Sequence, residues 1–180
     1  LNASSLLFST DGAICHQYPP VEGRKLKNLY SARMGERMKP FRVSFLVNPI
    51  SGGGRGRELY DLLSEVMLSF GFGDDEWSAE LTERENGELQ IARLAQQSDR
   101  LIAVGGDGTM NALLSELVLH PDERITVGLI PLGTGNDLAR VLGIYQNYAS
   151  KGLPNTLRKL VMSHSHLFDV WRLSDKRMMA

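Results

Sequence analysis

Residues 101–118 read LIAVGGDGTMNALLSELV, and this stretch decides the fold. It opens with the short apolar run Leu-Ile-Ala-Val, continues through a Gly-rich loop at residues 105–108, and then repeats apolar residues at intervals of three and four. A short apolar run is typical of a buried parallel strand, and the later spacing is typical of a helix. The stretch therefore predicts a strand, a glycine loop and a helix in succession, with the helical stripe at Met110, Leu113, Leu114 and Leu117.

Two further glycine clusters, at residues 52–56 and 128–135, also follow apolar runs. Those runs occupy residues 43–47 and 125–130. The repetition predicts an α/β fold, with an open, mostly parallel, Rossmann-like sheet and flanking helices. Ligands bind outside the carboxyl ends of the strands in such sheets, so the three clusters predict one shared site. Two more helical stripes are expected, at Leu59, Leu62, Leu63, Val66 and Phe70, and at Leu89, Ala92 and Leu94.

Three parts are expected along the chain. Residues 1–40 are polar and lack sustained periodicity, which predicts a partly disordered leader. Residues 41–164 form the α/β domain. Residues 165–180 predict a strand, a turn and a return strand, and a lone hairpin buries no face. We therefore expect residues 165–180 to be the first strands of a truncated C-terminal β-rich domain.

Composition narrows the function classes. The 20 basic and 21 acidic residues give a net charge of −1, so no overall field favours nucleic acid, and we expect no nucleic-acid partner. No apolar run reaches the length of a membrane span. The single cysteine, Cys15, excludes an intrachain disulfide and fits a reducing compartment. These features indicate a globular chain that is soluble or peripheral.

The first glycine cluster, Asn48-Pro49-Ile50-Ser51-Gly52-Gly53-Gly54, is suited to an anion. Glycine lets backbone N–H groups approach a phosphate, and the following helix N-terminus adds positive charge, to which Arg55 and Arg57 contribute. No Lys-Ser/Thr pair follows, and Arg57 interrupts the dinucleotide fingerprint, so neither standard nucleotide motif is present. A plain strand-to-helix turn would also account for this cluster.

The second and third clusters bring carboxylates to the same edge. Asp107 stands between glycines, and we expect it to reach a metal-bound phosphate or to take a hydroxyl proton. The alternative is that it serves only as a helix cap. In the third cluster, Asn136 and Asp137 are natural cap residues after a pair of glycines. If the glycines serve the ligand, Gly52 and Gly106 should accept a Cβ with the fold largely intact.

These clusters, with Leu81-Thr82-Glu83-Arg84, resemble in order and spacing the motifs of the diacylglycerol kinase catalytic-domain family. That family includes sphingosine and ceramide kinases and is distantly related to NAD kinases. The resemblance runs from about Val43 to Leu173. It implies an ATP-dependent lipid kinase of phospholipid biosynthesis that uses Mg²⁺ and transfers the γ-phosphoryl group to diacylglycerol or a related glycerolipid. Residues 41–164 would form its nucleotide-binding domain, and a C-terminal β-sandwich would begin at residue 165.

The resemblance also implies a cytoplasmic, peripherally membrane-associated protein whose partners are ATP and a membrane-embedded lipid, with membrane contact through the C-terminal domain. Asp107 would be catalytic, accepting or orienting the hydroxyl proton. No residue is assigned as a metal ligand, because His164 and His166 lack suitably spaced partners. The residues expected to bind the nucleotide or line the cleft are Asn48, Ser51, Gly52, Thr82, Gly105, Gly106, Gly108, Thr109, Gly133, Thr134, Gly135, Asn136 and Asp137.

One departure from the family pattern keeps a second class of function open. Family members commonly carry Glu three residues after the Thr109 position, where this chain has Ala112. That difference favours a nucleotide-binding regulatory module without transfer activity. A sphingosine- or ceramide-type kinase and an NAD kinase also stay open, although the Leu-Gly-Thr-Gly-Asn-Asp form of residues 132–137 favours a glycerolipid acceptor.

Overall fold

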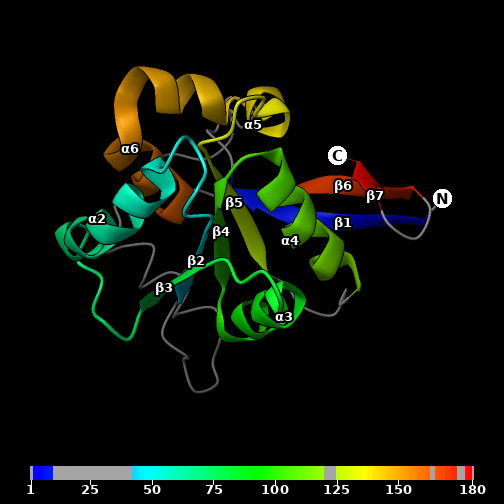
Figure 1. The fold of residues 1–180 in the computed structure, drawn as a ribbon, viewed down its shortest axis with the longest axis horizontal. Coiled ribbons are helices and arrows are strands. Elements are labelled where there is room, and N and C mark those ends of the chain that lie inside the picture. Colours follow the sequence, from blue (N-terminus) through cyan, green and yellow to red (C-terminus); the bar gives the residue numbers. More distant parts are fainter. Residues whose placement is uncertain (1, 10–41, 120–124, 163–164, 174–176, 180) are drawn as a thin grey trace.

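The computed structural model describes residues 2–9, 42–119, 125–162, 165–173 and 177–179, and within them seven strands form one sheet (Figure 1). Their order is β3-β2-β4-β5-β1-β6-β7. The strands from β3 to β1 in this order run parallel, β6 is antiparallel to β1, and β7 is antiparallel to β6. The predicted fold class is confirmed. The strands are β1 Asn2–Ser9, β2 Val43–Val47, β3 Trp77–Leu81, β4 Arg100–Gly105, β5 Thr126–Pro131, β6 Ser165–Leu173 and β7 Arg177–Met179.

Helices cover both faces of the sheet. Helices α3 and α4 pack against each other on one face, and α2 and α6 lie on the other (Figure 1). The α6 helix is interrupted at Gly152, two residues before Pro154. None of the described helices is both long and apolar enough to cross a bilayer. The helices are α2 Arg55–Ser69, α3 Gly87–Gln97, α4 Asp107–Leu119, α5 Asp137–Val141 and α6 Ile144–Met162.

Strands β2, β4 and β5 are buried along their whole length. A strand covered on both faces is apolar on both, which explains the three continuous runs that the sequence shows. Strand β3 is different, because it lies at the edge of the sheet and every residue is half-buried. Its mixed sequence, Trp-Ser-Ala-Glu-Leu, gave no strand prediction.

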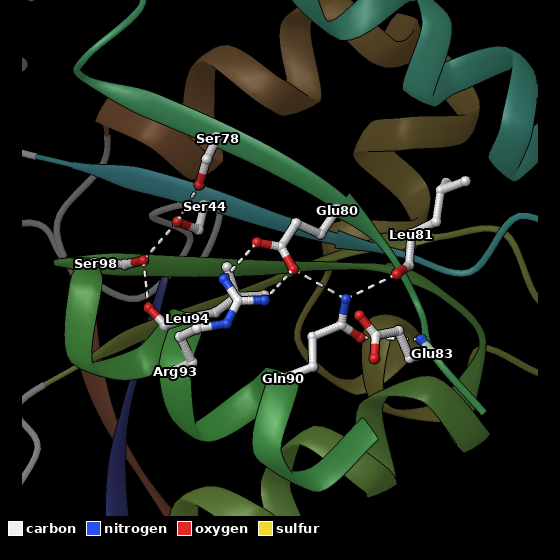
Figure 2. Close-up of polar contacts among 9 residues, drawn as sticks. All are labelled: Ser44, Ser78, Glu80, Leu81, Glu83, Gln90, Arg93, Leu94 and Ser98. Atoms are coloured by element: carbon white, nitrogen blue, oxygen red, sulfur yellow. Dashed lines mark hydrogen bonds and ion pairs between the residues drawn. The ribbon is translucent and has the colours of Figure 1, made fainter. Parts of the chain in front are cut away.

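A series of serine hydroxyl contacts, centred on the buried Ser44, joins β3, β2 and the end of α3 (Figure 2). The Ser44 side chain is fully buried, and its hydroxyl lies 2.7 Å from that of Ser78 and 2.6 Å from that of Ser98. The Ser98 hydroxyl also donates to the Leu94 carbonyl at 2.5 Å. Buried hydroxyls need such partners, so this series fixes α3 against the β2–β3 edge.

The buried faces of two helices differ from the predicted stripes. Leu62 on α2 is 50% exposed and Leu89 on α3 is 72% exposed. The row of α2 that faces the sheet repeats at intervals of four residues and consists of Leu59, Leu63 and Met67. Apolar residues spaced by three and four mark a face of the helix that is broader than the row packed against the sheet. The predicted stripes therefore contain Leu62 and Leu89, which flank the packed rows. The buried residues of α3 are Gln90, Ile91, Leu94 and Ala95.

The two ends of the chain meet in the sheet. Strand β1 lies within residues 1–40, the segment predicted as a partly disordered leader, and it pairs with β5 and β6, which the sequence did not predict for Asn2–Ser9. Its partners lie more than a hundred residues away, and no local pattern reveals them. Residues 10–40 lie outside the described residues. The predicted antiparallel hairpin is present as β6 and β7. It continues this same sheet, and a further β-rich domain stays a prediction.

The burial of α2 predicts a contrast between neighbouring leucines. Leu63 is 1% exposed, so Leu63→Ala should lower the free energy of unfolding by about 2–5 kcal/mol through lost transfer energy and a cavity. Leu62→Ala, the matched control, should change it by less than about 1 kcal/mol. Urea denaturation of both variants measures the contrast. Equal losses would mean that α2 packs with another face.

Candidate active site

Backbone hydrogen bonds align the loops that follow the parallel strands. The Thr82 amide donates to the Val47 carbonyl at 2.9 Å, and the Asn48 amide donates to the Val104 carbonyl at 2.9 Å. The Leu132 amide continues the series by donating to the Gly105 carbonyl at 2.8 Å. The loops after β3, β2, β4 and β5 therefore emerge together at one edge of the sheet, which the sequence predicted for the three glycine loops after β2, β4 and β5.

The loop after β2 turns through three consecutive left-handed residues. Gly52, Gly53 and Gly54 have φ values of +66°, +71° and +99°, a region that side chains disfavour. Among the described residues, no acceptor is found for the amide N–H groups of these three glycines. Helix α2 begins at the next residue, and its N-terminus adds partial positive charge. Free amides at a helix N-terminus form an anion-binding arrangement.

The two arginines after this loop are engaged locally. The Arg55 Nε donates to the Gly52 carbonyl at 3.2 Å, so Arg55 stays at the loop. The Arg57 guanidinium instead lies over the Tyr60 ring, 5.6 Å from its centroid, and its Nε is 3.5 Å from Asp61 Oδ1. Of the two arginine side chains expected to serve an anion, that of Arg55 bonds to the loop and that of Arg57 does not, although the Arg57 amide donates to the Pro49 and Gly54 carbonyls.

Asn48 and Thr109 fasten the first loop to the second. The Asn48 Nδ2 donates to Thr109 Oγ1 at 3.1 Å, while its Oδ1 accepts from the Ile50 amide at 3.2 Å. Thr109 packs over Gly105 so closely that a Cβ there would lie 2.4 Å from its Oγ1. Both polar side chains therefore hold loop positions by direct contacts within the protein.

The second and third loops touch through glycine backbone. A Cβ on Gly133 would lie 2.5 Å from the Gly106 Cα, and a Cβ on Gly106 would lie 2.9 Å from the Gly133 Cα. A Cβ on Gly52 would lie 2.9 Å from the Leu132 carbonyl oxygen. Real Cβ atoms do not approach so closely, so the expectation that Gly52 and Gly106 accept a side chain is wrong. These glycines are required by packing between loops.

Asn136 closes the third loop on itself. Its backbone is left-handed, with φ 54° and ψ 41°, and its side chain is 3% exposed. The Nδ2 donates to the Gly133 carbonyl at 2.6 Å, and the Oδ1 accepts from the Gly133 amide at 2.8 Å. Its side chain forms no cap on α5, which corrects the predicted capping role. The Arg140 Nε supports the same loop by donating to the Gly135 carbonyl at 2.9 Å.

Two carboxylates lie near Gly135. A Cβ on this glycine would lie 2.9 Å from Asp107 Oδ2, closer than real Cβ atoms come, and 3.7 Å from Asp137 Oδ1, which is an ordinary contact, so the absence of a side chain leaves room for Asp107. The Asp107 Oδ1 is buried and has no hydrogen-bond partner among the described residues. A buried acceptor without a partner is costly, and it is typical of a position that a ligand completes.

The described residues contain no group of three or more His, Cys, Asp or Glu side chains that could hold a metal ion. Mg²⁺ is commonly bound by one or two carboxylates together with substrate phosphates. The Asp107 and Asp137 pair, with the orphaned Oδ1, fits that mode.

The remaining predicted residues fall on the same loops or in the first turns of the helices α4 and α5 that follow them. Gly108, Thr134 and Asp137 are exposed at the edge, and Ser51 and Thr82 are half-buried beside it. Ala112, where the family pattern has Glu, is exposed on α4. His164 lies outside the described residues. The sequence missed Gln90, which is buried next to the Thr82 loop, because a lone glutamine in a helix gives no signal.

Comparisons with known proteins agree with this geometry. A family model described as diacylglycerol kinase catalytic domain matches residues 42–173. The chain is 38% identical over 106 residues to a diacylglycerol kinase of Bacillus subtilis, covering 57% of this chain and 33% of that protein. It is 35% identical over 135 residues to the eye-specific diacylglycerol kinase of Drosophila melanogaster, covering 73% of this chain and 9% of that protein.

The chain is also similar to a sphingosine kinase and to a solved diacylglycerol kinase structure. Human sphingosine kinase 1 is 31% identical over 121 residues, covering 61% of this chain and 30% of that protein. A solved diacylglycerol kinase structure from Bacillus anthracis superposes with a TM-score of 0.51 at 28% identity, over 64% of this chain and 39% of that one. The chain thus spans about a third or less of the length of these three curated relatives.

The contact between glycine loops predicts an effect on stability. Gly133→Ala forces a Cβ against the Gly106 Cα and should lower the free energy of unfolding by about 1–3 kcal/mol. Gly87→Ala is the control, because no atom lies within 4 Å of the added Cβ at the first residue of α3. Thermal unfolding compares the two. An unchanged midpoint for Gly133→Ala would show that the loops are not in contact.

Proposed function

The chain belongs to the diacylglycerol kinase catalytic-domain family, and we propose that it is the nucleotide-binding, catalytic part of a lipid kinase. The transferred group is the γ-phosphoryl group of ATP, and the acceptor is a hydroxyl of diacylglycerol or a related glycerolipid. The observation that carries this proposal is the buried, unpartnered Oδ1 of Asp107, which stands beside Asp137 at the edge where the three glycine loops meet.

The nucleotide phosphates find donors on the first loop. The free N–H groups of Gly52, Gly53 and Gly54 and the N-terminus of α2 would bind phosphate oxygens, with Arg55 adding a nearby positive charge. The N-terminus of α4, which begins at Asp107, opens onto the same edge. Asn48, Thr109 and Asn136 act indirectly in this proposal, because their side chains hold the loops in place.

A bound Mg²⁺ would be held by the carboxylates of Asp107 and Asp137 together with phosphate oxygens, and it would supply neutralisation of the phosphate charge. The Asp107 carboxylate orients the acceptor hydroxyl and takes its proton. The hydroxyl oxygen then forms the new bond to the γ-phosphorus as the bond to ADP breaks. Positioning of both reactants by fixed loops supplies much of the rate in such transfers.

A second candidate is a nucleotide-binding regulatory module without transfer activity, which Ala112 favours. Transfer assays with diacylglycerol, sphingosine, ceramide and NAD as acceptors separate these classes, and we expect transfer to the glycerolipid. A cytoplasmic location with peripheral membrane contact, and a second, β-rich domain from residue 165, stay predictions. The assay is therefore made on the full-length protein that contains these residues.

Asp107→Asn provides the test of the chemistry. The amide keeps the size of the side chain but cannot take a proton, so kcat for diacylglycerol phosphorylation should fall by about 10²–10⁴-fold. ATP affinity, measured by calorimetry, should fall far less, because the loop amides remain.

Asp75→Asn is the matched control, since Asp75 is exposed in the loop between α2 and β3. It should keep the kinetic constants of the unmodified protein. Near-normal turnover by Asp107→Asn would remove Asp107 from the reaction.

A further inference from the structure

The Thr82 loop follows the edge strand β3, which has a neighbour on one side only. The backbone of Thr82 donates to the Val47 carbonyl of β2 at 2.9 Å, and the described residues place no further strand on the other side of β3. A residue in this loop that meets a ligand therefore needs a support from outside the sheet. The first turn of α3, which follows the Thr82 loop directly in the sequence, supplies this support.

Gln90 of α3 contacts backbone groups on both sides of Thr82 (Figure 2). Its side-chain Nε2 donates to the Leu81 carbonyl at 2.8 Å, and its Oε1 accepts from the Glu83 amide at 3.0 Å. Gln90 is 4% exposed, although glutamine is rarely buried. These two bonds replace the neighbouring strand that β3 lacks at this end.

An ion pair fixes which way the Gln90 amide faces. Arg93 holds Glu80 with two short contacts, at 2.8 Å and 2.7 Å, and Glu80 Oε2 accepts from Gln90 Nε2 at 3.0 Å. The hydrogen bonds from Arg93 lower the pKa of Glu80 below its ordinary value. Glu80 therefore remains a carboxylate, which only accepts, and the Nε2 of Gln90 must face it.

We propose that Gln90 is a positioning residue that holds Thr82 toward the nucleotide, with the Glu80–Arg93 pair holding Gln90 in turn. This inference rests on the proposed ATP site at the carboxyl edge of the sheet. Gln90 touches no ligand in this arrangement. Its contribution is to ATP binding, through the position of Thr82, and the phosphoryl-transfer step at Asp107 does not depend on it.

Gln90→Met tests the two bonds to the Thr82 loop, because methionine keeps the length of the side chain and removes these bonds together with the one to Glu80. ATP affinity of the 180-residue chain should fall about tenfold, since a net loss of one to two neutral hydrogen bonds is of that order. In the full-length protein the KM for ATP should rise by a similar factor while kcat changes little. Gln97→Met, an exposed position on the same helix, should leave both unchanged.

Gln90→Glu adds a readout that simple destabilisation would not produce. At neutral pH the carboxylate cannot donate to the Leu81 carbonyl and repels Glu80, so ATP binding should be weak. Protonation restores one donor, so affinity relative to Gln90→Met should improve as the pH is lowered toward 5. Should Gln90→Met fail to fold, Arg93→Met tests the same network from a residue that is 47% exposed, with about a threefold loss expected.

Calorimetric titration with ATP and Mg²⁺ decides between the outcomes, with thermal unfolding to show that each variant is folded. Binding by the unmodified chain, with weaker binding by folded Gln90→Met and Arg93→Met, supports the inference. If folded Gln90→Met or folded Arg93→Met binds ATP as tightly as the unmodified chain does, the inference is overturned. The proposed ATP site is not affected by that result. No ATP binding by the unmodified chain overturns the proposed function itself and this inference with it.

Discussion

The close approach of Gly106 to Gly133 is the constraint on which the site depends. With no side chain on either residue, the loops after β4 and β5 meet backbone to backbone, and a Cβ on one would lie within 3 Å of the other. The same closeness recurs between Gly105 and Thr109 and between Gly52 and the Leu132 carbonyl. Protein atoms therefore fill the space that a side chain on these glycines would need, while the amides of residues 52–54 and Asp107 Oδ1 have no hydrogen-bond partner among the described residues.

This packing explains how an acidic site is held at the end of a buried sheet. Asp107 opens α4 directly after the loop that Gly133 contacts, so its carboxylate is set by the loop contact and by the helix together. One of its oxygens is buried without a partner among the described residues, an arrangement that lowers stability unless a ligand completes it. Asn136 and Asn48 hold the surrounding loops, the first through the Gly133 backbone and the second through Thr109. The polar residues at this edge thus form two groups. Asn48 and Asn136 hold the loops through hydrogen bonds, whereas Asp107 has an oxygen without a partner among the described residues.

The sequence predicted the parts of the fold whose pattern is local. Strands β2, β4 and β5 are buried on both faces, so each shows a continuous apolar run, and the glycine clusters marked the shared edge. It missed β3 because an edge strand mixes polar and apolar residues, and β1 because its partners are distant in sequence. The loops after β2, β4 and β5 share one edge as the sequence predicted, and the binding of a ligand by their residues stays a prediction; the sequence did not show that Gly52, Gly106 and Gly133 are also required by packing between loops. Gln90 was missed because its role depends on the backbone of a segment seven to nine residues away.

The central claim is that the glycine loop after β2 receives the phosphates of ATP. The most direct measurement is nuclear magnetic resonance of the ¹⁵N-labelled 180-residue chain during titration with ATP and Mg²⁺. The account predicts that the amide resonances of Gly52, Gly53 and Gly54 shift most and saturate together, because their N–H groups have no acceptor among the described residues. Gly71, at the far end of α2, should not move. Saturating ATP that leaves the resonances of residues 52–54 unchanged would contradict the account.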